Sequence, residues 1–208
     1  MSEPLSIDQV MRTSPVIPVI SLDGSIDPAE LARTYVANGL RVIEVTLRTP
    51  QALDCIRAMA DVEGAIVGAG TVLNEAQLDR AIEAGSKFIV SPGLTEPLGK
   101  AAVARGIPFL PGIATAGDLM RGLDLGLDRF KFFPAEASGG RAALKAISAP
   151  FGNIRFCPTG GITPETAGDW LGLEAVLCVG GSWLLKDGES DFTAIGARAR
   201  AAAALRQV

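Results

Sequence analysis

The chain alternates short β-branched apolar runs with alanine- and leucine-rich stretches that carry their apolar residues at helical spacing. The first pattern is typical of a buried strand, and the second is typical of a helix packed on one face. Strands are expected at residues 16–20, 41–46, 65–69, 88–90, 108–110, around Lys131, 154–156 and 175–179. Helices are expected at about 5–13, 28–38, 50–60, 74–84, 96–105, 116–123 and 140–147, just after Pro164, and in the C-terminal stretch rich in Ala and Arg.

Eight strand–helix units therefore follow one another, at a spacing of roughly 20–25 residues. Strands that alternate with helices predict right-handed βαβ units and a parallel sheet. Eight such units predict an α/β fold of the closed (β/α)8 TIM-barrel type, with an extra N-terminal helix, over a single domain at 1–208. The alternative is an open doubly wound sheet, but its nucleotide-binding form has no support because no GxGxxG motif follows the first strand.

Charge and hydropathy narrow the range of partners. The net charge of −4 leaves no basic footprint, so neither nucleic acid nor an anionic membrane surface is an expected partner. No apolar run reaches the ~18–20 residues that a membrane span needs. The segment Met1–Pro4 lacks the basic and apolar regions of a signal peptide, so we expect a cytoplasmic protein.

The chain contains no histidine, and this shortens the list of possible mechanisms. Nucleophiles activated by histidine and histidine-ligated catalytic zinc are both excluded. The three cysteines, Cys55, Cys157 and Cys178, have no metal-binding spacing and are expected to be small buried hydrophobic residues. We therefore expect no metal site, and acid–base chemistry must use carboxylate, lysine, tyrosine, cysteine, backbone or water.

One lysine, Lys131, lies inside a short apolar and aromatic run that Pro134 ends. Lysine is almost never fully buried unless it is paired or functional. Burial disfavours the charged ammonium, and the neutral amine is a nucleophile that forms Schiff bases with carbonyl compounds. The alternative is a strand-end lysine whose ammonium reaches water. Lys131 is thus the first candidate for a covalent catalytic residue.

Two more charged residues, Glu44 and Arg48, belong to the second expected strand and the turn after it. In a (β/α)8 barrel the active site lies at the C-terminal ends of the strands, so both are site candidates. Glu44 near Lys131 would suit general acid–base catalysis, and the alternative is a structural ion pair with Arg48 or Lys131. Arg48 would suit a bidentate clamp on a carboxylate, and the alternative is a surface arginine that opens a helix.

Glycine pairs follow the last two expected strands, as Gly160-Gly161 and as Gly180-Gly181-Ser182. Glycines let backbone N–H groups approach anionic oxygens, and the loops after strands seven and eight often form the phosphate site of this barrel. A single Gly-Gly usually marks only a turn. Two pairs at the two expected strands indicate a phosphate site.

Six segments together resemble the 2-keto-3-deoxy-6-phosphogluconate (KDPG) aldolase and 4-hydroxy-2-oxoglutarate (KHG) aldolase family of class I, Schiff-base aldolases. These segments are Glu44–Thr49, Val67–Val72, Ser91–Thr95, Phe130–Glu136, Arg155–Ile162 and Gly180–Trp183. The similarity extends over nearly the whole chain from about Ile7.

The resemblance implies reversible cleavage of 2-dehydro-3-deoxy-6-phosphogluconate to pyruvate and glyceraldehyde 3-phosphate in the Entner–Doudoroff pathway, without a cofactor. Lys131 would form the Schiff base and Glu44 would be the general acid–base group. The substrate-binding residues that it implies are Arg48, Thr71, Pro92, Phe133 and Thr159, and the phosphate-binding residues are Gly160, Gly161, Gly180, Gly181 and Ser182. Such enzymes take a small phosphorylated keto-sugar acid, and relatives are homotrimers.

The chain departs from part of the wider family at the end of the first strand, where some members carry an arginine in reach of the phosphate. Here that position is Ser21, with Asp23 close behind. An aldolase for the galactonate analogue or for 4-hydroxy-2-oxoglutarate is an alternative. Two other classes also stay open, a phosphate-binding isomerase or epimerase with no covalent intermediate and a binding protein without catalysis.

Overall fold

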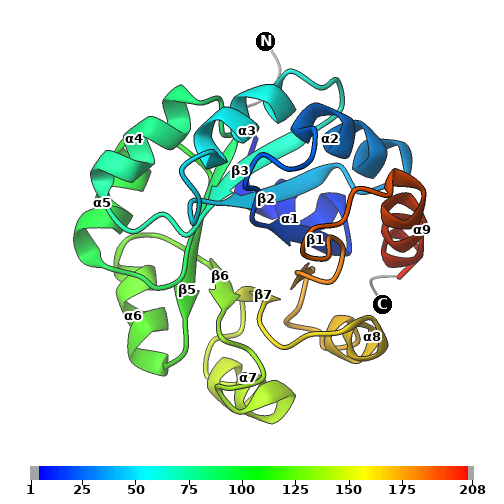
Figure 1. Ribbon diagram of the computed structural model, residues 1–208. Coiled ribbons are helices and arrows are strands. Elements are labelled where there is room, and N and C mark those ends of the chain that lie inside the picture. The colour runs from blue at the N-terminus through cyan, green and yellow to red at the C-terminus, as the bar shows by residue number, and fades with distance from the viewer. Residues whose placement is uncertain (1–4, 206–208) are drawn as a thin grey trace.

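Parallel strands form a barrel, and helices ring it on the outside (Figure 1). The structure is a computed structural model and describes residues 5–205. The strands are β1 (Val16–Ile20), β2 (Val42–Thr46), β3 (Ile66–Gly70), β4 (Phe88–Ser91), β5 (Phe109–Ile113), β6 (Arg129–Phe132), β7 (Arg155–Pro158) and β8 (Val179–Gly181). Their order is β7-β6-β5-β4-β3-β2-β1-β8, and bridges Phe156–Val176 and Thr159–Gly180 join the two ends. The expected TIM barrel is confirmed.

Each strand is followed by a helix that packs on the outer face of the barrel (Figure 1). The helices are α1 (Ile7–Thr13), α2 (Pro28–Ala37), α3 (Ala52–Ala60), α4 (Glu75–Glu83), α5 (Glu96–Ala104), α6 (Ala116–Asp124), α7 (Gly140–Ser148), α8 (Pro164–Leu171) and α9 (Phe192–Ala203). At the start of α2 the Asp27 carboxylate accepts hydrogen bonds from the backbone N–H groups of Ala29 and Glu30. None of the described helices combines the length and apolar character that a membrane crossing needs.

Two strands, β5 and β8, differ most from their expected positions. The last one was expected at 175–179, but β8 is Val179–Gly181, and Val176 keeps only a bridge to β7. The strand β5 was expected at 108–110 and extends to Ile113. In both places the missed residues include glycine or proline, which have low strand propensity and usually mark a strand's end. Pairing with the neighbouring strands of the closed barrel overrides that propensity.

Side chains of each strand alternate between the helix-facing core and the interior of the barrel, as the two-residue strand period requires. On β6, Phe130 and Phe132 face the helices and belong to the larger core cluster. Arg129 and Lys131 must then point inward. A smaller cluster packs inside the barrel, next to helix α1. Its members are Val10, Met11, Ile17, Val42, Phe88, Val90, Leu110, Cys157, Leu177 and Cys178. All three cysteines are buried and free, as expected.

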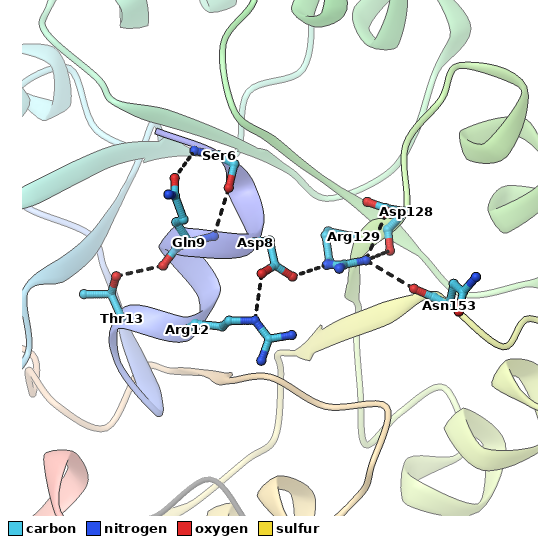
Figure 2. Close-up of polar contacts among 8 residues, drawn as sticks. All are labelled: Ser6, Asp8, Gln9, Arg12, Thr13, Asp128, Arg129 and Asn153. Atoms are coloured by element: carbon cyan, nitrogen blue, oxygen red, sulfur yellow. Dashed lines mark hydrogen bonds and ion pairs between the residues drawn. The ribbon is translucent and has the colours of Figure 1, made fainter. Parts of the chain in front are cut away.

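Helix α1 closes the N-terminal end of the barrel. Its Val10 and Met11 are fully buried in the inner cluster. Figure 2 shows the polar anchor beside them: Arg129 on β6 donates to the Asp8 carboxylate at 2.6 Å, and Asp8 also accepts from Arg12 at 2.7 Å. Arg129 donates further to backbone carbonyls of Asp128 and Asn153. Two hollows lined by residues from the C-terminal ends of strands lie at the opposite end of the barrel.

Candidate active site

Lys131 and Glu44 form a buried contact inside the barrel. The Lys131 Nζ lies 3.0 Å from Glu44 Oε1 and 3.3 Å from Oε2, and the two side chains are 7% and 4% exposed. The ring of Phe133 faces the same nitrogen at 5.5 Å, within the range of a cation–π contact. A carboxylate that touches a buried amine can exchange a proton with it directly. The arrangement therefore places a potential nucleophile and a potential acid–base group close enough to act on the same substrate carbon.

Arg48 does not take part in this pair. Its side chain is exposed just beyond β2, and within residues 5–205 it forms no ion pair or side-chain hydrogen bond. The alternative of a Glu44–Arg48 ion pair is therefore wrong, whereas the Glu44–Lys131 pair is present. An exposed guanidinium without an internal partner is available to a planar anion such as a carboxylate.

A hollow of about 450 Å³ opens at the C-terminal ends of β1, β2 and β8. Arg48 and Ser182 line it, and so does Lys186, whose ammonium forms no ion pair in the described part of the chain. Sequence reasoning missed Lys186, although its place just after the Gly-Gly-Ser segment was a signal. Neither Lys131 nor Glu44 lines this hollow, but Val19 lines it and is in register with Glu44 on the neighbouring strand.

The β1 side of this hollow presents hydrogen-bond acceptors. Thr46 donates its hydroxyl proton to the Ile20 carbonyl at 3.1 Å, and Ser21 Oγ lies 2.6 Å from Thr46 Oγ1. The Thr46 hydroxyl has a single proton, which it donates to Ile20, so Ser21 is the donor in the second bond. The Ser21 oxygen is left with lone pairs alone, and Asp23 lies on the same wall. The cations that line the hollow are Arg48 after β2 and Lys186 after β8, and Asp187 and Glu189 line it beside Lys186.

A second hollow, of about 350 Å³, opens on the Phe133 side of the pair. Pro92 and Phe133 line it, as does the backbone of Gly112. Thr71 follows β3 at this end of the barrel and has a φ of 57°, the left-handed region that a β-branched residue rarely adopts. Such strain costs of order 1–3 kcal/mol and is concentrated at functional sites.

The loop after β7 carries Thr159 and the first glycine pair. Thr159 is 6% exposed, and a Cβ on Gly180 would lie 2.3 Å from its hydroxyl, so Gly180 leaves the space that Thr159 occupies. Gly160 and Gly161 have φ values of 103° and 79°, a conformation that favours glycine. The Ala135 N–H donates to the Thr159 carbonyl at 2.8 Å and anchors this loop to the one after β6.

The structure thus brings the expected site residues to one end of the barrel, but in three neighbouring groups. Glu44 and Lys131 are inside, Arg48 and Ser182 line one hollow, and Pro92 and Phe133 line the other. Among residues 5–205 there is no group of three or more histidine, cysteine, aspartate or glutamate side chains that could hold a metal ion.

Comparison with known proteins relates this site to one family. The family model described as "Aldolase: KDPG and KHG aldolase" matches residues 7–197. The chain is 55% identical over 201 residues to 2-dehydro-3-deoxy-phosphogluconate aldolase of Zymomonas mobilis, covering 97% of each chain. It is 56% identical over 181 residues to the KHG/KDPG aldolase of Escherichia coli, covering 86% of this chain and 85% of that one.

A solved structure adds a chemical observation on a relative. The chain resembles KDPG aldolase of Legionella pneumophila with a TM-score of 0.92 and 39% identity, covering 96% of this chain and 99% of that one. That structure is described as holding pyruvate captured at low pH as a covalent carbinolamine intermediate.

Proposed function

The chain belongs to the KDPG and KHG aldolase family, and from this we propose that it is a class I aldolase acting on 2-dehydro-3-deoxy-6-phosphogluconate. The products are pyruvate and glyceraldehyde 3-phosphate, and the reaction is a reversible step of the Entner–Doudoroff pathway. One observation carries the proposal: the buried contact between Lys131 and Glu44, with 3.0 Å between Nζ and Oε1. Together with the family membership, this contact favours an aldolase over a binding protein or an isomerase.

Lys131 must lose a proton before it can act as a nucleophile. When substrate displaces the ion pair, the Glu44 carboxylate takes one proton from the Lys131 ammonium across their contact. The neutral amine then attacks the substrate's C2 ketone to give a carbinolamine. The protonated Glu44 gives its proton to the leaving hydroxyl, so that water departs, an iminium forms and Glu44 is a carboxylate again. The iminium is an electron sink, which makes the neighbouring C3–C4 bond breakable.

Glu44 moves the protons of the cleavage step. As the C3–C4 bond breaks, its electrons enter the iminium and form an enamine, and Glu44 accepts the C4 hydroxyl proton, directly or through a water. The protonated Glu44 then returns a proton to C3 of the enamine. Hydrolysis of the resulting iminium releases pyruvate and restores the Lys131 amine. One carboxylate serves both transfers because it touches the nitrogen on which the intermediate is built.

The pyruvyl part of the substrate lies between the two hollows. Arg48 and Thr71 hold its carboxylate, and Pro92 and Phe133 pack against its carbon chain. Thr159 donates or accepts a hydrogen bond at a substrate oxygen. The unpaired guanidinium of Arg48 and the apolar lining at Pro92 and Phe133 support these roles.

The phosphate occupies the side of the site between β7 and β8. Backbone N–H groups of Gly160, Gly161, Gly180 and Gly181 and the Ser182 hydroxyl bind its oxygens. Lys186 supplies the positive charge, since Ser21 stands where part of the family has arginine and offers no free proton. With hydrogen bonds from the glycine loops and charge from Lys186, the chain binds a phosphorylated substrate without an arginine after β1.

A second substrate is favoured by the similarity to the KHG/KDPG aldolase of E. coli. We propose that 4-hydroxy-2-oxoglutarate is cleaved too, to pyruvate and glyoxylate, because its reacting carbons match those of the first substrate. The galactonate-series phosphate is the alternative sugar acid. A homotrimer and a cytoplasmic location, without nucleic acid or membrane partners, belong to the same proposal.

Pyruvate release tests the proposal. Purified protein is mixed with each of the three candidate substrates, and lactate dehydrogenase with NADH reports pyruvate. We expect the highest kcat/KM for the gluconate-series phosphate, and measurable turnover of 4-hydroxy-2-oxoglutarate. No pyruvate from any of the three would contradict the proposal, and a preference for the galactonate series would replace its substrate.

A further inference from the structure

Gly70, the last residue of β3, lies against the carboxylate of Glu44. Its strand pairs with β2, with Gly68 in register with Glu44 and Gly70 in register with Thr46. A Cβ built on Gly70 would lie 2.2 Å from Glu44 Oε1, 2.7 Å from Cγ and 2.8 Å from Cδ. Real Cβ atoms essentially never lie within 3.0 Å of a non-bonded heavy atom of another residue. The Glu44 side chain therefore occupies the volume that any other residue at position 70 would fill.

Backbone conformation gives no reason for glycine at this position. Gly70 ends a strand, its φ is outside the left-handed region, and its carbonyl accepts from the Leu47 N–H at 2.8 Å. Glycine inside a strand costs about 0.5–1 kcal/mol relative to alanine. The next residue does have the left-handed φ, and there the chain carries Thr71. Backbone preference alone would place the glycine at 71 and not at 70.

We propose that Gly70 is a positioning residue, whose missing side chain makes the space in which the Glu44 carboxylate meets Lys131. An alanine there must push the carboxylate away from the amine, because all three close atoms belong to the functional end of Glu44. The inference rests on the proposed acid–base role of Glu44 and adds a residue to it. Gly68 on the same strand differs, since a Cβ there would strike the Phe88 ring in the inner core.

The test is a double-substitution cycle on the whole protein. Gly70→Ala in the wild-type background is expected to lower kcat by about 10²–10⁴-fold, the usual worth of an acid–base group. Its kcat–pH profile should match that of Glu44→Ala. In the Glu44→Ala background the clashing atoms are gone, so Gly70→Ala should change kcat by less than about twofold. Gly168→Ala, in α8 with nothing within 4 Å of the added methyl, is the matched control and should leave kcat unchanged.

Outcomes separate the inference from the proposed function. An inactive wild type would remove the proposed function itself. With an active wild type, a Gly70→Ala variant of unchanged kcat, or one whose loss is equally large in both backgrounds, would overturn the positioning role. If Gly70→Ala alone does not fold, Gly70→Ala/Glu44→Ala is expected to unfold within about 2 °C of Glu44→Ala. A double variant as unstable as Gly70→Ala would show a backbone or packing role and overturn the proposal.

Discussion

Lys131 on β6 and Glu44 on β2 touch across the interior of the barrel, although they are 87 positions apart in the sequence. Their strands are four places apart in the eight-strand order, which puts them on opposite walls. Only the closed barrel brings such strands into reach of one another. Closure of the barrel thus brings Lys131 into contact with Glu44. At the N-terminal end of the barrel, helix α1 is held to β6, the strand of Lys131, by the hydrogen bond from Arg129 to Asp8.

Replacing Lys131 by alanine is expected to abolish turnover, because within residues 5–205 no other lysine contacts Glu44 to form the iminium. Pyruvate release should fall below about one-hundredth of the wild-type rate. Circular dichroism should show the native helical content. Lys145→Ala, at an exposed lysine of α7 away from the site, is the control and should keep full activity. A Lys131→Ala variant above that limit would contradict the Schiff-base role.

Glu44→Gln separates proton transfer from imine formation. Glutamine keeps the size of the side chain but cannot take up a proton, so kcat is expected to fall about 10²–10⁴-fold. The Lys131 amine remains, and borohydride should still trap pyruvate on it. Single-turnover kinetics and mass spectrometry measure the two quantities. If trapping is lost along with turnover, Glu44 is needed to form the imine itself.

Lys186→Gln tests the source of positive charge for the phosphate. The KM for the phosphorylated sugar acid should rise roughly tenfold, equivalent to about 1.4 kcal/mol, while its kcat stays near wild type. The KM for 4-hydroxy-2-oxoglutarate, which has no phosphate, should not change. Lys145→Gln removes the same charge from the other end of the barrel and serves as the control. If KM rises equally for both substrates, or for neither, groups other than Lys186 bind the phosphate.

The α1 anchor predicts a stability effect that depends on pH. Burial alone would raise the pKa of Asp8, but hydrogen bonds from Arg12 and Arg129 outweigh it and hold the pKa below its usual value. A depressed folded-state pKa stabilises the fold above the unfolded value of about 4, and this is lost as the pH falls through the folded value.

Asp8→Asn should therefore lower Tm at pH 7 by about 2–4 °C, the shift that about 1 kcal/mol produces in a chain of this size. The gap to wild type should shrink below about pH 4. Asp54→Asn removes an exposed partner of Arg57 and should leave Tm unchanged at both pH values. Differential scanning calorimetry measures both variants. A gap that does not depend on pH would mean that Asp8 stabilises α1 without its charge.

Much of the fold could be predicted from the sequence, because each βα unit carries its own local signals. The Asp27-Pro28 pair stands at the start of an expected helix, and the apolar, aromatic run around Lys131 predicted a strand. Glycine-containing strand ends gave no such signal. Gly180 and Gly181 belong to β8 through pairing with Ile17 and Pro18 of β1, a partner far away in the sequence.

The site was less accessible to sequence reasoning. Residue types and strand ends indicated Lys131, Glu44 and Arg48, but not which carboxylate and cation would meet. That choice depends on barrel diameter and on inward glycines such as Gly70, which leave room for another residue's side chain. Lys186 follows the Gly-Gly-Ser segment closely in the sequence, but only the path of the loop after β8 brings it to the hollow that Arg48 lines. Contacts between residues on distant strands leave no pattern in the local sequence from which they could be predicted.

Borohydride trapping tests the central claim most directly. The protein is incubated with pyruvate and reduced with borohydride, and peptide mapping then locates the added mass, with Lys131→Ala treated in parallel. We expect a stable adduct on Lys131 in the wild type and none in the variant, because the iminium forms on that amine. No adduct at saturating pyruvate, or an adduct on another lysine, would contradict the Schiff-base mechanism.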